Sequence, residues 1–216
     1  MKRWKIFKLF IVMCLTFSII LGSGNYLYAK EGRDLSYINE NNTIENNIVG
    51  PQKRTKADII SFYQEHPYNM SQRVTYQEYP SFSPYMAGKL SDQTVTDGLN
   101  ALNFVRFIAG IPADISIKEE YEIMAQTGSV VLAKNNQITH TPENIYNIPD
   151  EFFSIGYSGT SKSNIGEGYV NISNSIIDGY IPDKDISNIE QVGHRRWILN
   201  PYMKYTGFGY EKMENI

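Results

Sequence analysis

The sequence predicts an α+β fold, because strongly punctuated helical patterns are followed by short strand-like runs. Two amphipathic helices are expected between residues 96 and 132. Strand-like runs follow at Gly168–Ile172 and Lys204–Tyr210, and shorter helical pieces at Ser173–Tyr180 and Gly193–Leu199. Pro201 disfavours helix at the residue before it and so closes the last piece.

The first of the two helices begins where Thr96 or Asp97 can cap its free N–H groups. It ends before Gly110 and Pro112, which are typical helix stop signals. The apolar residues that repeat on one face, and that we expect to be buried, are Ala101, Leu102, Val105, Ile108 and Ala109.

The second helix is predicted from a capping box, in which Ser116 is followed three residues later by Glu119. Residues spaced for one helical face follow this box. The predicted buried stripe consists of Tyr121, Met124, Ala125, Gly128 and Leu132.

Residues 1–29 have the pattern of a secretory signal peptide, with four basic residues before Leu9 and an almost wholly apolar run from Leu9 to Gly22. As a helix this run would reach about 21 Å, which is short of the ~30 Å hydrocarbon core, so we expect cleavage after Ala29 rather than a stable membrane span. The rest of the protein would then act outside the cell, secreted or associated with the envelope.

The chain beyond residue 29 contains no cysteine, which excludes disulfides, a cysteine nucleophile and a thiolate metal site there. It carries 16 of the 20 Lys and Arg residues and all 23 Asp and Glu residues, a formal net charge of −7. Because such a chain repels phosphate backbones, nucleic acid is not expected as a partner.

Residues 30–84 are predicted to form a polar spacer that includes one short helix. The asparagine-rich stretch at 39–47 offers too little apolar surface to offset the entropy of ordering. Lys56–His66 can form an amphipathic helix that Pro67 stops. The aromatic stretch Tyr79–Leu90 is expected to lie over the core as a strap, and the main domain is placed at 85–216.

Two of the three histidines stand in unusual sequence contexts, and a glycine-flanked carboxylate lies between them. His140 occurs in Thr-His-Thr-Pro, His194 in Gly-His-Arg-Arg-Trp, and Glu167 between Gly166 and Gly168. Two imidazoles and a carboxylate can hold a divalent metal or move protons. Spacing alone does not show that they meet, and a hydrogen-bonded structural role for each histidine is the competing interpretation. His66, beside Pro67, is expected at the surface.

These segments resemble a known family when they are taken together. The run Gly193–Pro201, the segment Asn164–Glu167, His140 after two helices, and the segment Leu102–Pro112 occur in the order seen in bacterial members of the CAP superfamily. That family, also called the SCP domain, includes cysteine-rich secretory proteins, antigen 5 and plant pathogenesis-related proteins. The resemblance covers Tyr85 to Tyr210.

The resemblance implies a three-layer α-β-α sandwich with a cleft lined by two histidines and two acidic residues. His140 and His194 match the histidines, and Glu167 matches the first acid. Counting along the chain brings the second acid to Asp183, with Asp178 and Asp185 as alternatives. Zinc or another divalent metal would be held by His140, Glu167, Asp183 and His194. A turn role for Asp183 after Pro182 stays open.

The resemblance also implies a further strand after Lys204–Tyr210, whereas the chain stops at Ile216. We therefore expect a domain that lacks its last C-terminal strand, which would leave Lys204–Tyr210 with unpaired backbone groups on one side. The oligomeric state stays open.

Three functions are compatible with these residues. The first is a non-enzymatic secreted protein that binds a divalent metal and a lipid-like or cell-envelope ligand. The second is a hydrolase in which His140, Glu167 and His194 activate water, although the mature chain lacks the Gly-x-Ser-x-Gly and His-Glu-x-x-His motifs. The third is a structural or adhesive role. Trp197 and Ile198 are expected to anchor their helix in the core, and Arg195 and Arg196 to face solvent or pair with acids.

Overall fold

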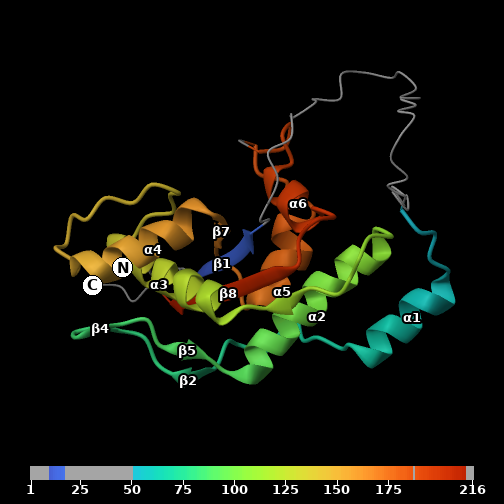
Figure 1. Cartoon of the computed structure of the whole chain (residues 1–216), viewed down its shortest axis with the longest axis horizontal. Coiled ribbons are helices and arrows are strands. Elements are labelled where there is room, and N and C mark those ends of the chain that lie inside the picture. Colours follow the sequence, from blue (N-terminus) through green and yellow to red (C-terminus); the bar gives the residue numbers. More distant parts are fainter. Residues whose placement is uncertain (1–9, 18–50, 187, 213–216) are drawn as a thin grey trace, which may run out of the picture.

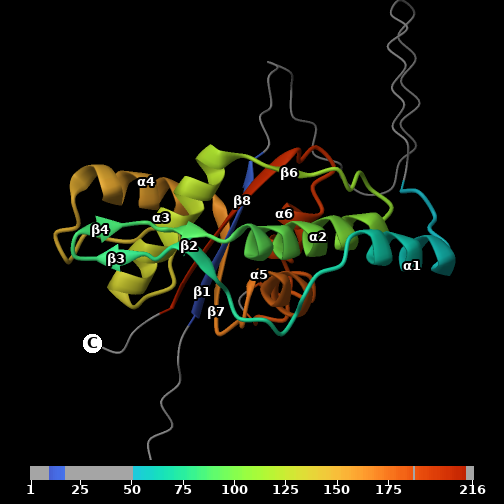
Figure 2. The same cartoon turned by 90° about the horizontal axis from the view of Figure 1, so that it is seen from below.

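The computed structural model describes residues 10–17, 51–186 and 188–212, and these form mixed helix and strand, as predicted (Figure 1). A sheet of four strands runs through the middle of the molecule. Figure 2 shows α3 and α4 on one side of these strands and α2, α5 and α6 on the other.

The sheet has the order β6-β8-β1-β7. Its strands are β6 (Ser116–Ile117), β8 (Tyr205–Lys212), β1 (Phe10–Phe17) and β7 (Ser163–Glu167). β6 and β8 are parallel, whereas β1 is antiparallel to both of its neighbours. The strand predicted at Lys204–Tyr210 is thus confirmed as β8. It was expected to have unpaired backbone groups on one side, but it has a neighbouring strand on both sides, β6 and β1.

The position of β1 is unexpected, because its residues belong to the predicted signal peptide. Each of its eight residues pairs with one residue of β8, from Phe10 opposite Lys212 to Phe17 opposite Tyr205. The rest of residues 1–29, including the predicted cleavage site, lies outside the described residues, as does the asparagine-rich stretch.

Helix α2 (Asp92–Ile108) begins earlier than predicted, because Ser91 and not Thr96 or Asp97 caps it. The Ser91 side chain accepts a hydrogen bond from Thr94 N at 3.2 Å. Ala101 and Leu102 are buried, as expected, but Ile108 is 48% exposed and the buried residue of the last turn is Arg106.

Helix α3 (Glu119–Asn135) packs directly on β8, because two glycines of that strand face it. A Cβ at Gly207 would lie 2.2 Å from the backbone carbon of Tyr121, and one at Gly209 would lie 2.2 Å from the Ala125 oxygen. Phe208, which points to the opposite face, is buried with Leu102, Ile172 and other residues of the larger core cluster.

The predicted capping box at the start of α3 is wrong. Ser116 and Ile117 form β6, and the N-cap residue is Lys118, whose side chain makes no capping hydrogen bond. Pairing with β8 provides hydrogen-bond partners for the backbone N–H groups of this segment: Ser116 N donates to Lys204 O, and Lys118 N donates to Thr206 O. Of the predicted stripe, Tyr121, Ala125, Gly128 and Leu132 are buried, whereas Met124 is half-buried.

The prediction of a strand at Gly168–Ile172 is wrong, because the strand in this region is β7, which ends at Glu167. Helix α4 (Asp150–Ser161), which the sequence pattern did not predict, precedes β7. The predicted helical pieces are confirmed as α5 (Ile172–Asn174) with the π-helical η1 (Ser175–Tyr180), and as α6 (Gly193–Ile198).

The segment before α2 contains the predicted helix, α1 (Lys56–Glu65), none of whose residues is buried. Two small hairpins follow, β2 (Tyr76–Glu78) with β5 (Lys89–Leu90), and β3 (Ser81–Phe82) with β4 (Tyr85–Met86). Tyr68, Val74 and Tyr76 pack against the larger core cluster, so contact with the core begins before the predicted strap. Across the described part of the chain, every helix is too short or too polar to cross a bilayer.

Candidate functional site

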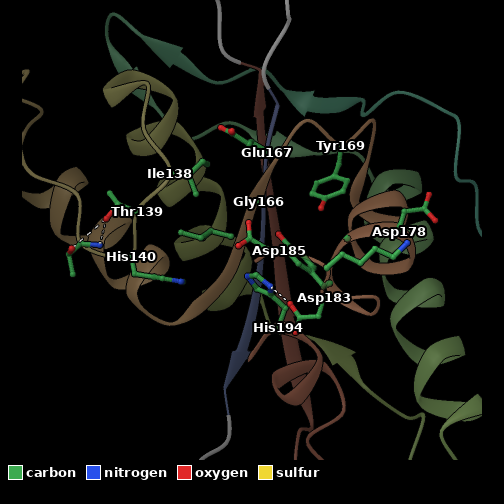
Figure 3. A pocket seen from close by; sticks show the side chains of 15 residues that line it. Ile138, Thr139, His140, Gly166, Glu167, Tyr169, Asp178, Asp183, Asp185 and His194 are labelled. Carbon is green, nitrogen blue, oxygen red and sulfur yellow. Dashed lines mark hydrogen bonds and ion pairs between the residues drawn. The ribbon is translucent and has the colours of Figure 1, made fainter. Parts of the chain in front are cut away.

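A cavity of about 810 Å³ lies beside β7 and η1, and it brings together residues from distant parts of the chain. His140, Glu167, Asp183 and His194, the four residues predicted from the sequence, all line it. Figure 3 shows His140 and His194 on opposite sides of the cavity, with Asp183 beside His194. The alternative acids Asp178 and Asp185 line it too.

His140 is exposed at the cavity and is held by the end of α4. Its Nδ1 atom lies 2.8 Å from the carbonyl oxygen of Thr160, which is fully buried. Because a carbonyl oxygen only accepts, Nδ1 must carry the proton in this contact. The Thr160 hydroxyl in turn donates to the His140 carbonyl at 3.3 Å. Neutral His140 therefore keeps its lone pair on Nε2.

His194, the second residue of α6, is oriented by Asp183. Its Nδ1 atom lies 2.9 Å from Asp183 Oδ1, and the Asp183 side chain is fully buried whereas that of His194 is 24% exposed. The carboxylate only accepts, so Nδ1 donates to it and the lone pair of neutral His194 is on Nε2. Both histidines thus have the same tautomer.

Asn188 completes the support of His194. Its Nδ2 atom donates to Asp183 Oδ1, and its Oδ1 atom accepts from Gly193 N at 3.1 Å. The same Nδ2 atom lies 2.9 Å from His194 Nδ1. Two donors cannot bond each other, and the buried carboxylate is the stronger acceptor, so we assign the His194 proton to the Asp183 bond.

The backbone at Asp183 adopts a left-handed conformation, with φ of 52°, and its N–H donates to Gly179 O at 3.0 Å. This is a common way to end a helix, and aspartate tolerates it. Asp183 Oδ2 accepts from Arg195 N at 3.1 Å, so the turn also reaches α6. Asp183 is therefore both a turn residue and a partner of His194.

Two tyrosines form the wall between β7 and η1. The buried Tyr180 ring lies 5.0 Å from the His194 ring, and Tyr169 lies 6.2 Å from Tyr180. Gly166 leaves room for both rings, since a Cβ there would lie 3.1 Å from Tyr169 and 3.2 Å from Tyr180. Gly168 has a φ of 83° and so forms a turn directly after Glu167, a conformation that glycine adopts easily.

The other acids differ in their availability to a ligand. Glu167 and Asp185 are exposed, and within the described residues no hydrogen bond is recorded for the Glu167 carboxylate. Asp178 accepts from Asn174 Nδ2 at 2.6 Å and, in Figure 3, lies away from both histidines. Asp183 is engaged within the protein through both of its oxygens.

The donor set fits a borderline divalent cation such as zinc in its chemistry: two neutral imidazoles and exposed carboxylates. In the described parts of the chain, no three His, Asp or Glu side chains stand close enough to form a ready metal cluster. The segments that carry His140, Glu167 and Asp185 would have to move closer to His194 to complete one.

Sequence reasoning missed Thr160 and Asn188, because one acts through a backbone oxygen and the other through an amide, and neither type has a distinctive sequence signal. Trp197 is 48% exposed, so the expectation that it anchors α6 in the core is wrong, whereas Ile198 is fully buried as expected. Arg195 is half-buried and donates to Ile181 O and Pro182 O, while Arg196 and His66 are exposed.

Comparisons with family models, with curated proteins and with solved structures found no match to this chain.

Proposed function

We propose that this chain is an exported CAP-type domain, an α-β-α sandwich that binds a divalent cation and a polar cell-envelope ligand in the cavity between His140 and His194. One observation carries the proposal: both imidazoles donate from Nδ1 to a buried acceptor and keep Nε2 for a ligand in the same cavity. Histidines that bind metals in proteins are held in this way by a carbonyl or carboxylate.

The cation would be bound by Nε2 of His140 and of His194, with the exposed carboxylates of Glu167 and Asp185 as further ligands. Asp183, which the sequence suggested as a ligand, is assigned instead to the orientation of His194, because both of its oxygens are already bonded. A bound cation would supply Lewis acidity at the cavity floor.

The lining supports a ligand that carries polar groups. Acids, hydroxyls and one lysine are the most numerous side chains in it, and Ile138 and Ile165 are its aliphatic members. The cationic side chain of Lys184 and the hydroxyls of Thr139, Thr141 and Tyr169 could bond the hydroxyl and carboxyl groups of an envelope saccharide or peptide.

Titration calorimetry with zinc tests the proposal at pH 7.5. The parent chain should bind one ion, and His140→Ala should abolish the heat because it removes one Nε2 ligand. His66→Ala is the matched control, since His66 is exposed and is not among the residues that line the cavity. Equal heats in the parent and His140→Ala would remove the metal from the proposal.

The pair Asp183–His194 favours a second candidate function, a hydrolase. A buried aspartate that bonds Nδ1 of a histidine fixes the tautomer and leaves Nε2 to take a proton from water. In this case Glu167 would assist at the opposite side of the cavity. Incubation with casein and with peptidoglycan separates the candidates: turnover that is lost in Glu167→Gln favours the hydrolase, and zinc binding without turnover favours the first proposal.

A further inference from the structure

Trp197 is the residue of α6 whose position the cavity between the two histidines does not explain. Its side chain is 48% exposed, although tryptophan is on average one of the more buried residues. Within the described residues, no hydrogen bond is recorded for its Nε1 atom and no second ring or cation is recorded against its indole. Helix α6 therefore presents a large aromatic surface to solvent.

A pocket of about 380 Å³ lies beside this indole, and we call it the α6 pocket. Its volume is within the range of about 300–1,000 Å³ that is typical of small-molecule sites. Its lining combines one face of the helix, at i, i+3 and i+4, with residues that lie just before and just after the helix. The lining residues are Gln191, Gly193, Arg196, Trp197 and Asn200.

The backbone that carries the α6 pocket is held from inside the protein. The buried Arg106 donates to the carbonyl oxygens of Ile198 at 2.6 Å and of Asn200 at 2.9 Å. Oδ1 of Asn200 accepts from Tyr202 N at 2.9 Å, which fixes the orientation of this side-chain amide. A site whose groups are already ordered loses less entropy when a ligand binds.

The polar side chains of the α6 pocket indicate the chemistry of a ligand. Arg196 and Gln191 are exposed, and within the described part of the chain neither side chain has a recorded hydrogen bond or ion pair. A guanidinium can bind a carboxylate through two parallel N–H groups, and an amide both donates and accepts, as a hydroxyl does. The negative face of the Trp197 indole attracts the polarised C–H bonds of a sugar ring. A hydrocarbon ligand would leave these polar groups unpaired.

We propose that the α6 pocket binds a saccharide that carries a carboxylate. The sugar ring stacks on Trp197, the carboxylate bonds the guanidinium of Arg196, and Gln191 bonds a hydroxyl or acetamido group. The α6 pocket shares no lining residue with the cavity that holds the two histidines, and the proposal does not depend on a bound cation.

Fluorescence of Trp197 tests the proposal at the site itself. The chain contains two tryptophans, Trp4 and Trp197, so the full chain with Trp4→Phe reports on the α6 pocket alone. The disaccharide of N-acetylglucosamine and N-acetylmuramic acid should change the emission along a saturable curve. Diacetylchitobiose, which lacks only the lactyl group with its carboxylate, should bind about tenfold more weakly, because it loses the charge-assisted bonds to Arg196.

Two variants separate the stacking contact from the charged contact, and both residues are exposed, so folding should be kept. Arg196→Met should bind the two disaccharides equally. Trp197→Ala should give no heat with either disaccharide in titration calorimetry. Tyr157→Ala, which removes an exposed aromatic side chain of α4 across the sheet (Figure 2), is the control and should bind like the parent. A tenfold preference that persists in Arg196→Met, or parent-like binding by Trp197→Ala, would overturn the proposal.

Two further results would assign the disaccharide or the pocket differently. Binding that is lost in His140→Ala but kept in Trp197→Ala would place the disaccharide in the histidine cavity and overturn the proposal. Tighter binding of uridine monophosphate than of the acidic disaccharide would make the α6 pocket a nucleotide site and would also overturn it. All these measurements are made without zinc, so their outcome is separate from that of the proposed cation site.

Discussion

Thr160 and Asp183 act on the cavity through the two histidines rather than by contact with a ligand. Each is buried, and each accepts the Nδ1 proton of one imidazole. The orientation of both Nε2 atoms thus depends on residues that do not themselves bind the proposed cation. Replacing the Asp183 side chain therefore tests the site without removing a ligand of the cation.

Asp183→Asn should weaken zinc binding about 10- to 100-fold, the usual effect of losing a partner of a metal-binding histidine. The amide can still occupy the space, but it loses the charge that favours the Nδ1–H tautomer. Calorimetry gives the affinity, and proton NMR of the His194 ring reports the tautomer. Asp178→Asn is the control, because Asp178 also lines the cavity but lies away from both histidines, and this variant should bind zinc like the parent. Equal losses in both variants would point to general electrostatics.

Arg106 is the second residue whose role is decided by its contacts. It is fully buried and donates to the carbonyls of Pro112 at 2.8 Å, Ile198 at 2.6 Å and Asn200 at 2.9 Å. Burial lowers the pKa of its guanidinium to about 10, so the group stays charged at pH 7. It therefore connects the end of α2 to the end of α6.

Arg106→Met should lower the free energy of unfolding by about 3 kcal/mol, because three carbonyls, including that of the buried Ile198, lose their donor while the aliphatic volume is kept. Urea denaturation measures the change. Arg196→Met is the matched control at an exposed position of α6 and should change stability by less than about 0.5 kcal/mol. A similar small change for Arg106→Met would mean that solvent replaces its three hydrogen bonds.

At the scale of elements, the contact between α3 and β8 depends on the absence of side chains at Gly207 and Gly209. Gly209→Ala places a Cβ against the backbone of α3, which cannot move aside as a flexible side chain can. We expect a loss of about 3 kcal/mol, at the upper end for overpacked sites. Thermal melting of Gly209→Ala checks this value.

Gly168→Ala serves as the comparison for that substitution. A Cβ at Gly168 meets no atom within 4 Å, but φ is 83°, so only backbone strain is added, and this costs about 1 kcal/mol. If both variants melted at the same temperature, close packing of α3 on the sheet would not be the source of the loss at Gly209.

The hairpin of β2 and β5 is joined to the central sheet by Tyr76, and this contact should be sensitive to alkaline pH. Tyr76 donates its hydroxyl proton to Tyr210 O at 3.0 Å, and burial raises the pKa of both Tyr76 and Tyr210 well above the usual range. Above pH ~10 the unfolded chain releases these protons and the folded chain keeps them, so stability should fall as pH rises.

Absorbance at 295 nm against pH measures this effect. A cooperative step of tyrosine ionisation should coincide with loss of the far-UV circular dichroism signal, because Tyr76 and Tyr210 release their protons only when the chain unfolds. Smooth titration of all tyrosines with intact secondary structure would contradict the prediction.

The elements that were predicted correctly are those with local signals. Helix α1 ends at Glu65, two residues before Pro67, and α6 ends before Pro201, whereas β8 alternates between glycines that face α3 and residues that face the core. Helix α4 was missed because Gly156 and Gly159 lower its helix propensity. Its packing explains the first of these glycines, since a Cβ at Gly156 would lie 2.5 Å from Val131.

The candidate site was predictable in its residues but not in its roles. The spacing of His140, Glu167, Asp183 and His194 did not show that they meet, but the family resemblance implied a common cleft, and all four line one cavity. Which acid orients a histidine and which faces solvent depends on the turn at Asp183 and on Asn188, and the local sequence pattern does not determine either. The central place of β1 depends on pairing with strands that lie far along the chain, which a local pattern cannot report.

At the scale of the whole molecule, a cation between His140 and His194 would join the loop after α3 to α6. Binding to the folded state alone raises stability by about 2.7 kcal/mol when the free ion exceeds its dissociation constant 100-fold. Zinc should therefore raise the melting temperature of the full chain by several degrees, and differential scanning calorimetry with and without zinc measures the shift.

The pH dependence of this shift identifies the ligands. Imidazoles bind zinc only when they are neutral, so protons compete with the ion at low pH. The shift in melting temperature should therefore be larger at pH 7.5 than at pH 5. Carboxylates alone would still bind at pH 5, and magnesium would then give a similar shift. A zinc shift that persists at pH 5, or in His140→Ala, would place the ion on the acidic surface and not between the two imidazoles.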